Sequence, residues 1–173
     1  MPLILPASLN DIPVIQSLAE RTWWSTYSSI ISAEQIRYML DTIYGAEELR
    51  HVMNNGSQTF IILSDENGPQ GYASFGLRSE NPEICKLHKL YVLPDNQGKG
   101  YGKMLVDDVI RRLMPGVKYL ELNVNRHNKA RDFYQRAGFK ILREEDVSIG
   151  PYWMNDYVMR LEVVNASLRN PSS

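Results

Sequence analysis

The chain has 173 residues, 43% of them hydrophobic, which is enough for one domain with a single sizeable core. Its 19 basic and 20 acidic residues give a net charge of −1, so it has no overall basic field to hold nucleic acid or an anionic membrane. Cys85 is the only cysteine and the three histidines are scattered, so neither a disulfide nor a metal site is predicted. No apolar run approaches the roughly 18 residues of a membrane span and no signal peptide is recognisable, which indicates a cytoplasmic protein.

The first apolar segment, residues 3–5, predicts a short strand, and apolar residues then recur at helical spacing. We expect Asn10, rather than Ser8, to cap this first helix. Pro13 then falls in the first turn, where its missing N–H leaves no helical hydrogen bond unmade.

Large aromatic residues crowd the expected corner between the first two helices. Trp23, Trp24 and Tyr27 are expected mainly to pack in the core, and Trp24 and Tyr27 are also candidates for the wall of a substrate cleft. The sequence Ser32-Ala33-Glu34-Gln35 is a capping box that starts the second helix.

Strands are predicted after a further helical stretch over residues 46–53. The Asn-Gly pair at 67–68 indicates a hairpin, and Asn81-Pro82 indicates a second turn. Three antiparallel strands are therefore expected, at residues 59–63, 71–75 and 84–93.

A glycine-rich turn joins the third of these strands to a helical pattern. Pro94 ends the strand because it cannot donate a ladder hydrogen bond. Gly98, Gly100 and Gly102 then let the backbone turn sharply with its N–H groups converging. With the positive end of the helix dipole and the charges of Lys99 and Lys103, such a turn is an anion site. The alternative is a tight turn that binds nothing.

Two common phosphate-binding motifs do not fit this turn. A P-loop requires Ser or Thr directly after its lysine, and neither Lys99 nor Lys103 has one. A dinucleotide fingerprint that starts at Gly98 would require a third glycine where Lys103 stands.

The second half of the chain alternates helices and strands. We expect a helix over 105–113, a strand over 117–124, a helix over 129–137 capped by Asn128, and strands over 139–143 and 157–163. This order predicts a mixed α/β fold around one sheet, with one domain over 1–164 and a disordered tail over 165–173.

Two separated motifs resemble the GCN5-related N-acetyltransferase (GNAT) superfamily. Gln97, Gly100 and Gly102 match its Gln/Arg-x-x-Gly-x-Gly/Ala pyrophosphate loop. Its second signature, Asn-x-x-(x)-x-Phe-Tyr-x-x-x-Gly-Phe, is matched from Asn128 to Phe139, with a spacing one residue short after the asparagine. The first 55 residues are similar, less specifically, to the bacterial PaiA-like polyamine branch. The resemblance implies acetyl-CoA as co-substrate, no metal, and a mostly antiparallel sheet flanked by helices, with a splayed central pair of strands.

The same resemblance implies which residues bind the cofactor. The backbone of Leu90, Tyr91 and Val92 would pair with the pantetheine arm, with one amide near the thioester oxygen. The remaining cofactor-binding residues would be Gln97, Gly98, Lys99, Gly100, Tyr101, Gly102, Lys103, Asn128, Arg131, Phe133 and Tyr134.

Acetyl transfer by direct attack needs a neutral amine, a polarised thioester carbonyl and a proton for the departing thiolate. The resemblance makes Tyr134 the candidate general acid, with its neighbour Phe133 expected in the core. A tyrosine that only packs is the alternative for Tyr134. An alkylamine titrates near pH 10, so a base is needed, and Glu83 and His88 are the candidates.

The acceptor is indicated only by charge. Glu144-Glu145-Asp146 is expected before the final strands, where an acidic cleft would favour a cationic amine such as a polyamine, although an ordinary solvated charge run is the alternative. We expect a small amine as acceptor, with a protein N-terminus or lysine as alternative. A non-catalytic acyl-CoA sensor is the second class, and the resemblance also allows a homodimer.

Overall fold

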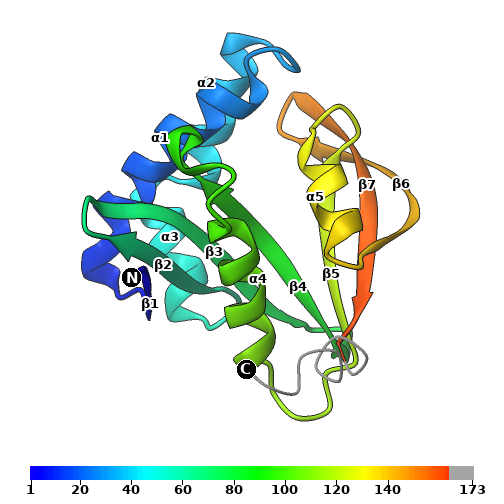
Figure 1. The fold of residues 1–173 in the computed structure, drawn as a ribbon. Helices are drawn as coiled ribbons and strands as arrows, with labels where there is room; N and C mark the ends of the chain where they lie inside the picture. The colour runs from blue at the N-terminus through cyan, green and yellow to red at the C-terminus, as the bar shows by residue number, and fades with distance from the viewer. Residues whose placement is uncertain (164–173) are drawn as a thin grey trace. The chain divides into compact units, whose positions relative to one another are not determined.

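The computed structural model describes residues 1–163, and the expected disordered tail, 165–173, lies outside these residues. The strands are β1 (Leu3–Pro6), β2 (Thr59–Asp65), β3 (Gly68–Arg78), β4 (Asn81–Val92), β5 (Tyr119–Asn125), β6 (Lys140–Ile149) and β7 (Tyr152–Glu162); the α-helices are α1 (Ile12–Tyr27), α2 (Ala33–Ile43), α3 (Ala46–Asn54), α4 (Tyr101–Arg111) and α5 (Ala130–Arg136). The strands form one mixed sheet in the order β1-β2-β3-β4-β5-β7-β6 (Figure 1). This confirms the predicted α/β class.

Most of the sheet is antiparallel, as predicted. The pairs β1–β2, β2–β3, β5–β7 and β6–β7 run antiparallel, whereas β4 and β5 run parallel. The parallel ladder joins Ile84–Leu87 to Tyr119–Leu122, while β4 continues to Val92. Two central strands that splay apart are expected to share only such a short ladder.

The described chain divides into two compact units. The first unit contains Met1–Gly76 and His88–Val109, and the second contains Leu77–Leu87 and the chain from Ile110 onward. Both β3 and β4 contribute residues to each unit. This division does not decide whether residues 1–164 form a single domain, so that expectation stays a prediction.

The start of α1 differs from the expectation. Asp11, not Asn10, is the N-cap residue of α1, and Ser8 caps the turn before it. The Ser8 hydroxyl accepts from the Asn10 amide at 3.3 Å, and the Asp11 carboxylate accepts from the Ser8 amide at 2.8 Å. This reciprocal capping box starts a short 3₁₀ turn, Leu9–Asp11, that leads into α1. Pro13 still lies in the first turn of the α-helix. The prediction was wrong because it did not allow for a separate 3₁₀ turn with its own cap.

In the first unit, helices cover both faces of the strands (Figure 1). Gly71 and Tyr72 are neighbours on β3 and point to opposite faces. Tyr72 is fully buried and bonds through its hydroxyl to Tyr44, at the end of α2. A Cβ on Gly71 would lie 3.2 Å from a methyl of Val92 and 3.4 Å from a methyl of Leu105 on α4. Glycine therefore lets β3 approach β4 and α4 closely.

In the second unit, the hairpin of β6 and β7 packs beside β5, and α5 lies over β5 (Figure 1). Lys129, not Asn128 as predicted, is the N-cap residue of α5, but the side-chain oxygen of Asn128 does accept from the Ala130 amide at 2.9 Å. Gly138 ends the helix with a φ of 104°, which glycine adopts freely.

Two strand boundaries in the second unit were wrong: β7 begins at Tyr152 rather than at residue 157, and β6 is longer than expected. The acidic run Glu144-Glu145-Asp146 was expected before the final strands, but it lies inside β6, which continues to Ile149. Three consecutive acidic residues interrupt the alternating pattern that identifies a strand. β6 is the edge strand of the sheet, where charged residues are tolerated on both faces.

Candidate active site

The glycine-rich turn lies in the first unit, between a 3₁₀ turn at Pro94–Asn96 and α4. Gly98 and Gly100 have φ values of 87° and 82°, which side chains on L-residues rarely allow. The first hydrogen bond of α4 runs from the Met104 amide to the Gly100 carbonyl at 3.0 Å. The amides of Tyr101, Gly102 and Lys103 therefore have no partner within the helix, and they face the same end of its dipole. This geometry suits a phosphate.

The two lysines of the turn have protein partners. The Lys99 ammonium donates to the Asn96 side-chain oxygen at 2.9 Å, and Lys103 forms an exposed ion pair with Asp107 at 2.8 Å. Asn96 is buried and donates to Gln70 on β3, so it fixes the turn against the sheet. The turn is thus shaped before any ligand arrives, and its lysines add charge at its rim.

Tyr101 anchors the other side of the turn. Its hydroxyl donates to the Asp65 carboxylate at 2.7 Å, at the end of β2. This hydrogen bond lowers the pKa of Asp65 and raises that of Tyr101. The hydroxyl of Tyr101 therefore serves the protein's own structure.

The strand segment Leu90, Tyr91 and Val92 is the last part of β4, and all three residues are half-buried. The Leu93 amide that follows donates to the Gln70 carbonyl at 2.9 Å. Backbone groups of such a segment are suited to pair with an extended ligand.

Tyr91 also belongs to an aromatic cluster beneath the strand. Its hydroxyl lies 2.9 Å from that of Tyr27, and its ring is 5.7 Å from Tyr72 and 6.0 Å from Trp23. Tyr44 completes the cluster, with its hydroxyl 2.7 Å from that of Tyr72. Burial raises the pKa of both Tyr44 and Tyr72 well above the ordinary phenol value, so these phenols remain neutral.

The two residues predicted to line a substrate cleft, Trp24 and Tyr27, have different surroundings. Tyr27 is buried in the aromatic cluster, whereas Trp24 is half-buried and donates its indole N–H to Glu20 at 3.0 Å. Both side chains lie within α1 and not at a corner after it. Their role in binding an acceptor stays a prediction, and Tyr27 has the better position because it contacts Tyr91.

The predicted bases differ in their surroundings. His88 is exposed on β4, in the first unit. Glu83 is exposed in the second unit and forms an ion pair with Lys118 at 2.9 Å. The ion pair favours a structural role for Glu83. Sequence reasoning missed Lys89, whose ammonium is buried and donates to Gln58 at 2.8 Å.

The predicted acid lies in the second unit, on α5. Tyr134 is 6% exposed and packs edge-on against Phe133 and Phe139, with ring centres 5.3 and 5.5 Å apart. Phe133, expected in the core, is only half-buried, so the more buried of the two rings is the tyrosine. Arg131, in the first turn of α5, lies over the Tyr157 ring at 5.6 Å.

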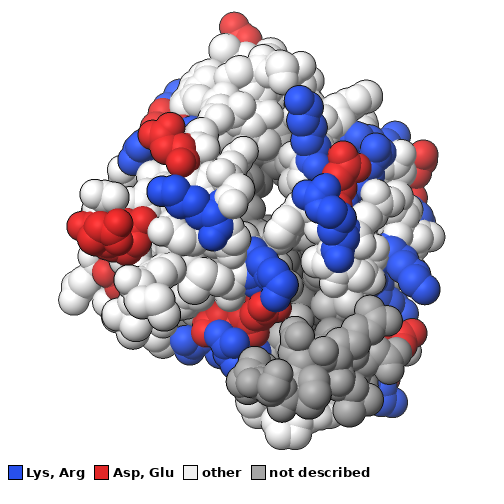
Figure 2. All heavy atoms as spheres, viewed as in Figure 1, with Lys and Arg blue, Asp and Glu red and all other residues white. Residues whose placement is uncertain are grey.

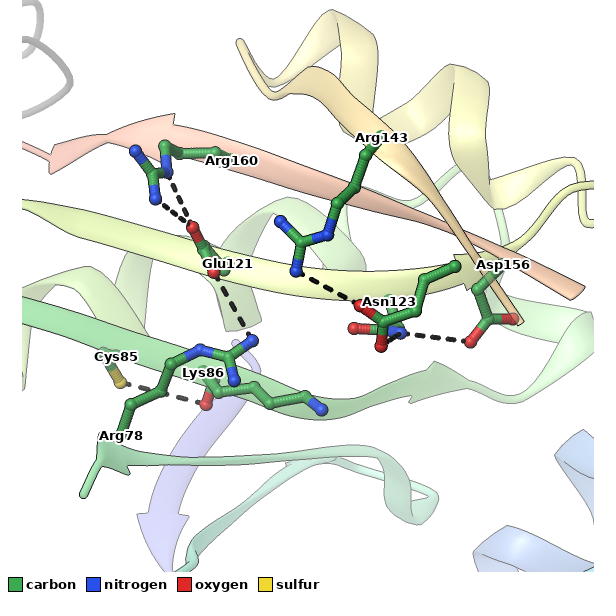
Figure 3. Close-up of polar contacts among 9 residues, drawn as sticks. Arg78, Cys85, Lys86, Glu121, Asn123, Arg143, Asp156 and Arg160 are labelled. Atoms are coloured by element: carbon green, nitrogen blue, oxygen red, sulfur yellow. Dashed lines mark hydrogen bonds and ion pairs between the residues drawn. The ribbon is translucent and has the colours of Figure 1, made fainter. Parts of the chain in front are cut away.

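One face of the strands in the second unit is charged (Figure 3). Glu121 on β5 is buried and binds two arginines: Arg160 on β7, through its Nε at 2.7 Å, and Arg78 at 3.4 Å. Next along β5, the amide of Asn123 donates to Glu145 and to Asp156, each at 3.3 Å. Asp156 is buried, and sequence reasoning missed it.

The acidic run of β6 does not form an open acidic cleft. Asp146 and Glu144 both lie beside Arg126, at 2.7 and 3.8 Å, and Glu145 pairs with Arg143 at 3.1 Å. The expected free negative charge is therefore mostly neutralised by arginines. Figure 2 shows basic and acidic side chains interspersed over the face in view.

A glycine turn followed by a helix whose first amides have no partner within the helix suits the phosphates of an acyl carrier. A family model described as an acetyltransferase (GNAT) domain matches residues 28–160. The chain belongs to the GNAT acetyltransferase family and is an acyltransferase with acetyl-CoA as its donor.

The relatives are all N-acetyltransferases. An uncharacterized N-acetyltransferase of Mycobacterium bovis is 26% identical over 158 residues, covering 90% of this chain and all of the relative. A spermidine N(1)-acetyltransferase of Thermoplasma acidophilum is 25% identical over 78% of this chain and 85% of its own. A peptidyl-lysine N-acetyltransferase of Salmonella typhimurium is 34% identical, but over 51% of this chain and 54% of its own.

The fold is similar to that of the PaiA N-acetyltransferase from Thermoplasma acidophilum, whose crystal structure contains coenzyme A. The TM-score is 0.79 with 24% identity, over 94% of this chain and 99% of that one. Among residues 1–163, no helix is long and apolar enough to cross a membrane, and no cluster of metal-ligating side chains is found.

Proposed function

We propose that the protein transfers the acetyl group of acetyl-CoA to a primary amine by direct attack in a ternary complex. The observation that carries this proposal is the turn before α4, where Gly98 and Gly100 have positive φ values and the first amides of α4 have no partner within the helix. Those amides suit the pyrophosphate of the donor, since they provide hydrogen bonds without bulk. Gln97, Lys99 and Lys103 border the same turn.

The strand Leu90–Val92 would pair with the pantetheine arm, and one of its amides would polarise the thioester carbonyl. An amide fixed in a strand needs no reorganisation when negative charge develops on that oxygen. The reaction forms the N–C bond of the amide and breaks the C–S bond of the thioester. The departing thiolate then takes a proton, and we assign the donor of that proton to Tyr134.

Burial supports this role for Tyr134. Its side chain is enclosed by Phe133 and Phe139, so its orientation is fixed by packing. Asn128 and Arg131 stand at the start of the same helix, where the family resemblance assigns them to the cofactor.

For the acceptor, we favour a small primary amine, with spermidine as the first candidate. The similarity to a spermidine N(1)-acetyltransferase, over 78% of this chain and 85% of that relative, supports it. The acidic run of β6 gives it no support, because Asp146 and Glu145 of that run already form ion pairs with arginines. A protein lysine is the second candidate because the relative that acts on peptidyl-lysine has the higher identity, over about half of the chain.

The test is thiol release from acetyl-CoA by the purified protein, with polyamines, amino acids, aminoglycosides and lysine peptides as acceptors. We expect turnover with one class of amine, saturable in acetyl-CoA. Binding of acetyl-CoA without turnover would replace the enzyme by a sensor. Absence of acetyl-CoA binding would overturn the role of the turn from Gln97 to Lys103.

A further inference from the structure

The proposed reaction needs a proton acceptor for the ammonium group of the substrate. Buried carboxylates are the natural candidates, since burial strengthens a carboxylate as a base. Glu121 has the greater burial, but two arginines hold it. Asp156 is buried to a similar degree, and its surroundings are different.

Asp156 lies on β7 at 7% exposure, yet among residues 1–163 its carboxylate makes no ion pair. Its hydrogen bond comes from the neutral amide of Asn123, at 3.3 Å. Arg126 donates only to the backbone carbonyl of Asp156, at 3.2 Å, and directs its guanidinium to Asp146. An ionised carboxylate that is buried without a cation in contact costs folding free energy. A cationic ligand bound beside it would offset that cost.

The surroundings of Asp156 are shaped to receive a cation. Glu145 lies opposite Asp156 on β6, is more exposed and pairs with Arg143 at 3.1 Å. Both carboxylates accept from the same amide of Asn123, which Figure 3 shows beside Asp156. The side-chain oxygen of Asn123, Oδ1, is buried and has no hydrogen-bond partner in the described part of the chain. Two carboxylates therefore lie beside the same amide group, and an ammonium group that reaches them has three N–H donors to offer.

A lysine on the same face lies near these carboxylates. Lys86 on β4 is partly buried, and its ammonium forms no hydrogen bond or ion pair with another residue of the described chain. Burial lowers the pKa of Lys86, with a further contribution from Arg78. Its charge favours ionised Asp156 and Glu145 from a distance without closing a salt bridge to either.

We propose that Asp156 receives the ammonium group of the acceptor amine and takes its proton, with Glu145 at the entrance and Asn123 orienting both carboxylates. This inference rests on the proposed function. The Asp156 carboxylate first takes one proton from the ammonium group, which leaves a neutral amine with a free lone pair. That lone pair attacks the thioester carbon to form the N–C bond, and the C–S electron pair leaves with the CoA sulfur, which is protonated separately. The nitrogen gives its second proton to solvent as the amide forms.

Titration of Asp156 supports this role. Burial raises the pKa of Asp156, and so does the nearby charge of Glu145, whereas the Asn123 amide, Lys86 and Arg126 lower it. The net direction is upward, which makes the ionised carboxylate a stronger base. All the charged groups that face the carboxylate come from β4, β6 and the segment after β5.

The first experiment compares wild type with Asp156→Asn, using the best acceptor found for the wild type. We expect kcat/KM for the amine to fall about 100-fold and its acidic limb to disappear, with unchanged affinity for acetyl-CoA. A fluorinated analogue of that acceptor, unprotonated at neutral pH, should react with both proteins at similar rates. Asp146→Asn, on the same strand as Glu145 and paired with Arg126, is the matched control and should behave as wild type.

A second variant keeps the proposal testable if Asp156→Asn does not fold. Asn123→Ala removes a hydrogen bond that lowers the pKa of Asp156, so the acidic limb of kcat/KM should move to higher pH. An unmoved limb in Asn123→Ala, or wild-type kcat/KM in a folded Asp156→Asn, would overturn the role of Asp156. Absence of turnover in the wild type itself would instead overturn the proposed function.

Discussion

The two units differ in the largest polar clusters that they bury. The first buries neutral phenols that bond to one another, such as Tyr44 with Tyr72 and Tyr27 with Tyr91. The second buries a carboxylate between arginines, with Glu121 beside Arg78 and Arg160. A neutral hydrogen bond can be lost at small cost, whereas removal of one member of a buried ion pair leaves a charge without its partner. The second unit should therefore respond more strongly to single polar substitutions.

The largest effect on stability is expected at Glu121. Glu121→Ala leaves Arg78 and Arg160 without their shared carboxylate, so the free energy of unfolding should fall by about 2–3 kcal/mol, measured by urea denaturation. The arginines are partly exposed and recover some hydration, which keeps the loss at this level. Glu144→Ala is the control, since Glu144 is exposed and lies 3.8 Å from Arg126. A loss below that of the control would contradict the contrast between the units.

The phenols of the first unit should be more tolerant. Tyr44→Phe removes the hydroxyl that lies 2.7 Å from Tyr72 and accepts from Trp23 at 3.2 Å. We expect a loss of about 1–2 kcal/mol in the same assay, because the neighbouring donors lose a partner but no charge is exposed. A loss larger than that of Glu121→Ala would reverse the comparison.

Tyr134 tests whether a buried phenol of the second unit differs from those of the first. Tyr134→Phe should lower kcat about 100-fold and leave the dissociation constant of acetyl-CoA unchanged, because only the proton donor is removed. Tyr119→Phe, in the same unit, should keep the wild-type kcat. Equal kcat values for wild type and Tyr134→Phe would leave Tyr134 with a packing role only.

The role of the turn before α4 in binding acetyl-CoA can be tested by comparing two glycines of similar conformation. Gly100 and Gly116 have φ values of 82° and 95°, and a Cβ on either would meet nothing within 4 Å. Alanine at each position should therefore cost a similar strain of about 1 kcal/mol. Only Gly100→Ala should weaken acetyl-CoA binding, by about 10-fold in calorimetry. Equal affinities in the two variants would separate the turn from the cofactor.

The sequence was sufficient where structure is local. The turn at Gly98 and Gly100 and the hydrogen bond that Asn128 makes to the start of α5 depend on residues that act within a few positions. Both were predicted from those residues, although α4 already begins at Tyr101, so that Gly102 lies in the helix, and the N-cap residue of α5 is Lys129.

The sequence was insufficient where a side chain finds its partner across the sheet. Asp156 and Asn123 are 33 residues apart, and Arg160 and Glu121 are 39 apart. The acidic run of β6 looked free because Arg126, its partner, lies on another segment. Strand register decides such pairs, and register is not visible in a charge pattern. The one available signal was the alternation of β5, where Glu121 and Asn123 interrupt apolar residues on the same strand.

The smallest effect on stability is expected for Asp156→Asn, and it should be a gain, whereas Glu121→Ala should lower stability. The pKa of Asp156 is raised above its ordinary value of 3.8, chiefly by burial, so the folded state disfavours the ionised form. Ionised Asp156 therefore costs stability at neutral pH, and this cost fades as the pH falls through the raised pKa toward the unfolded value. Asp156→Asn should raise the melting temperature at pH 7 by about 2–4 °C, with a smaller gain at pH 4, measured by thermal unfolding at both values. A lower melting temperature at pH 7 would mean that the carboxylate stabilises the fold, as Glu121 does. A gain in stability together with a loss of activity would mark Asp156 as a residue retained for function at a cost to the fold.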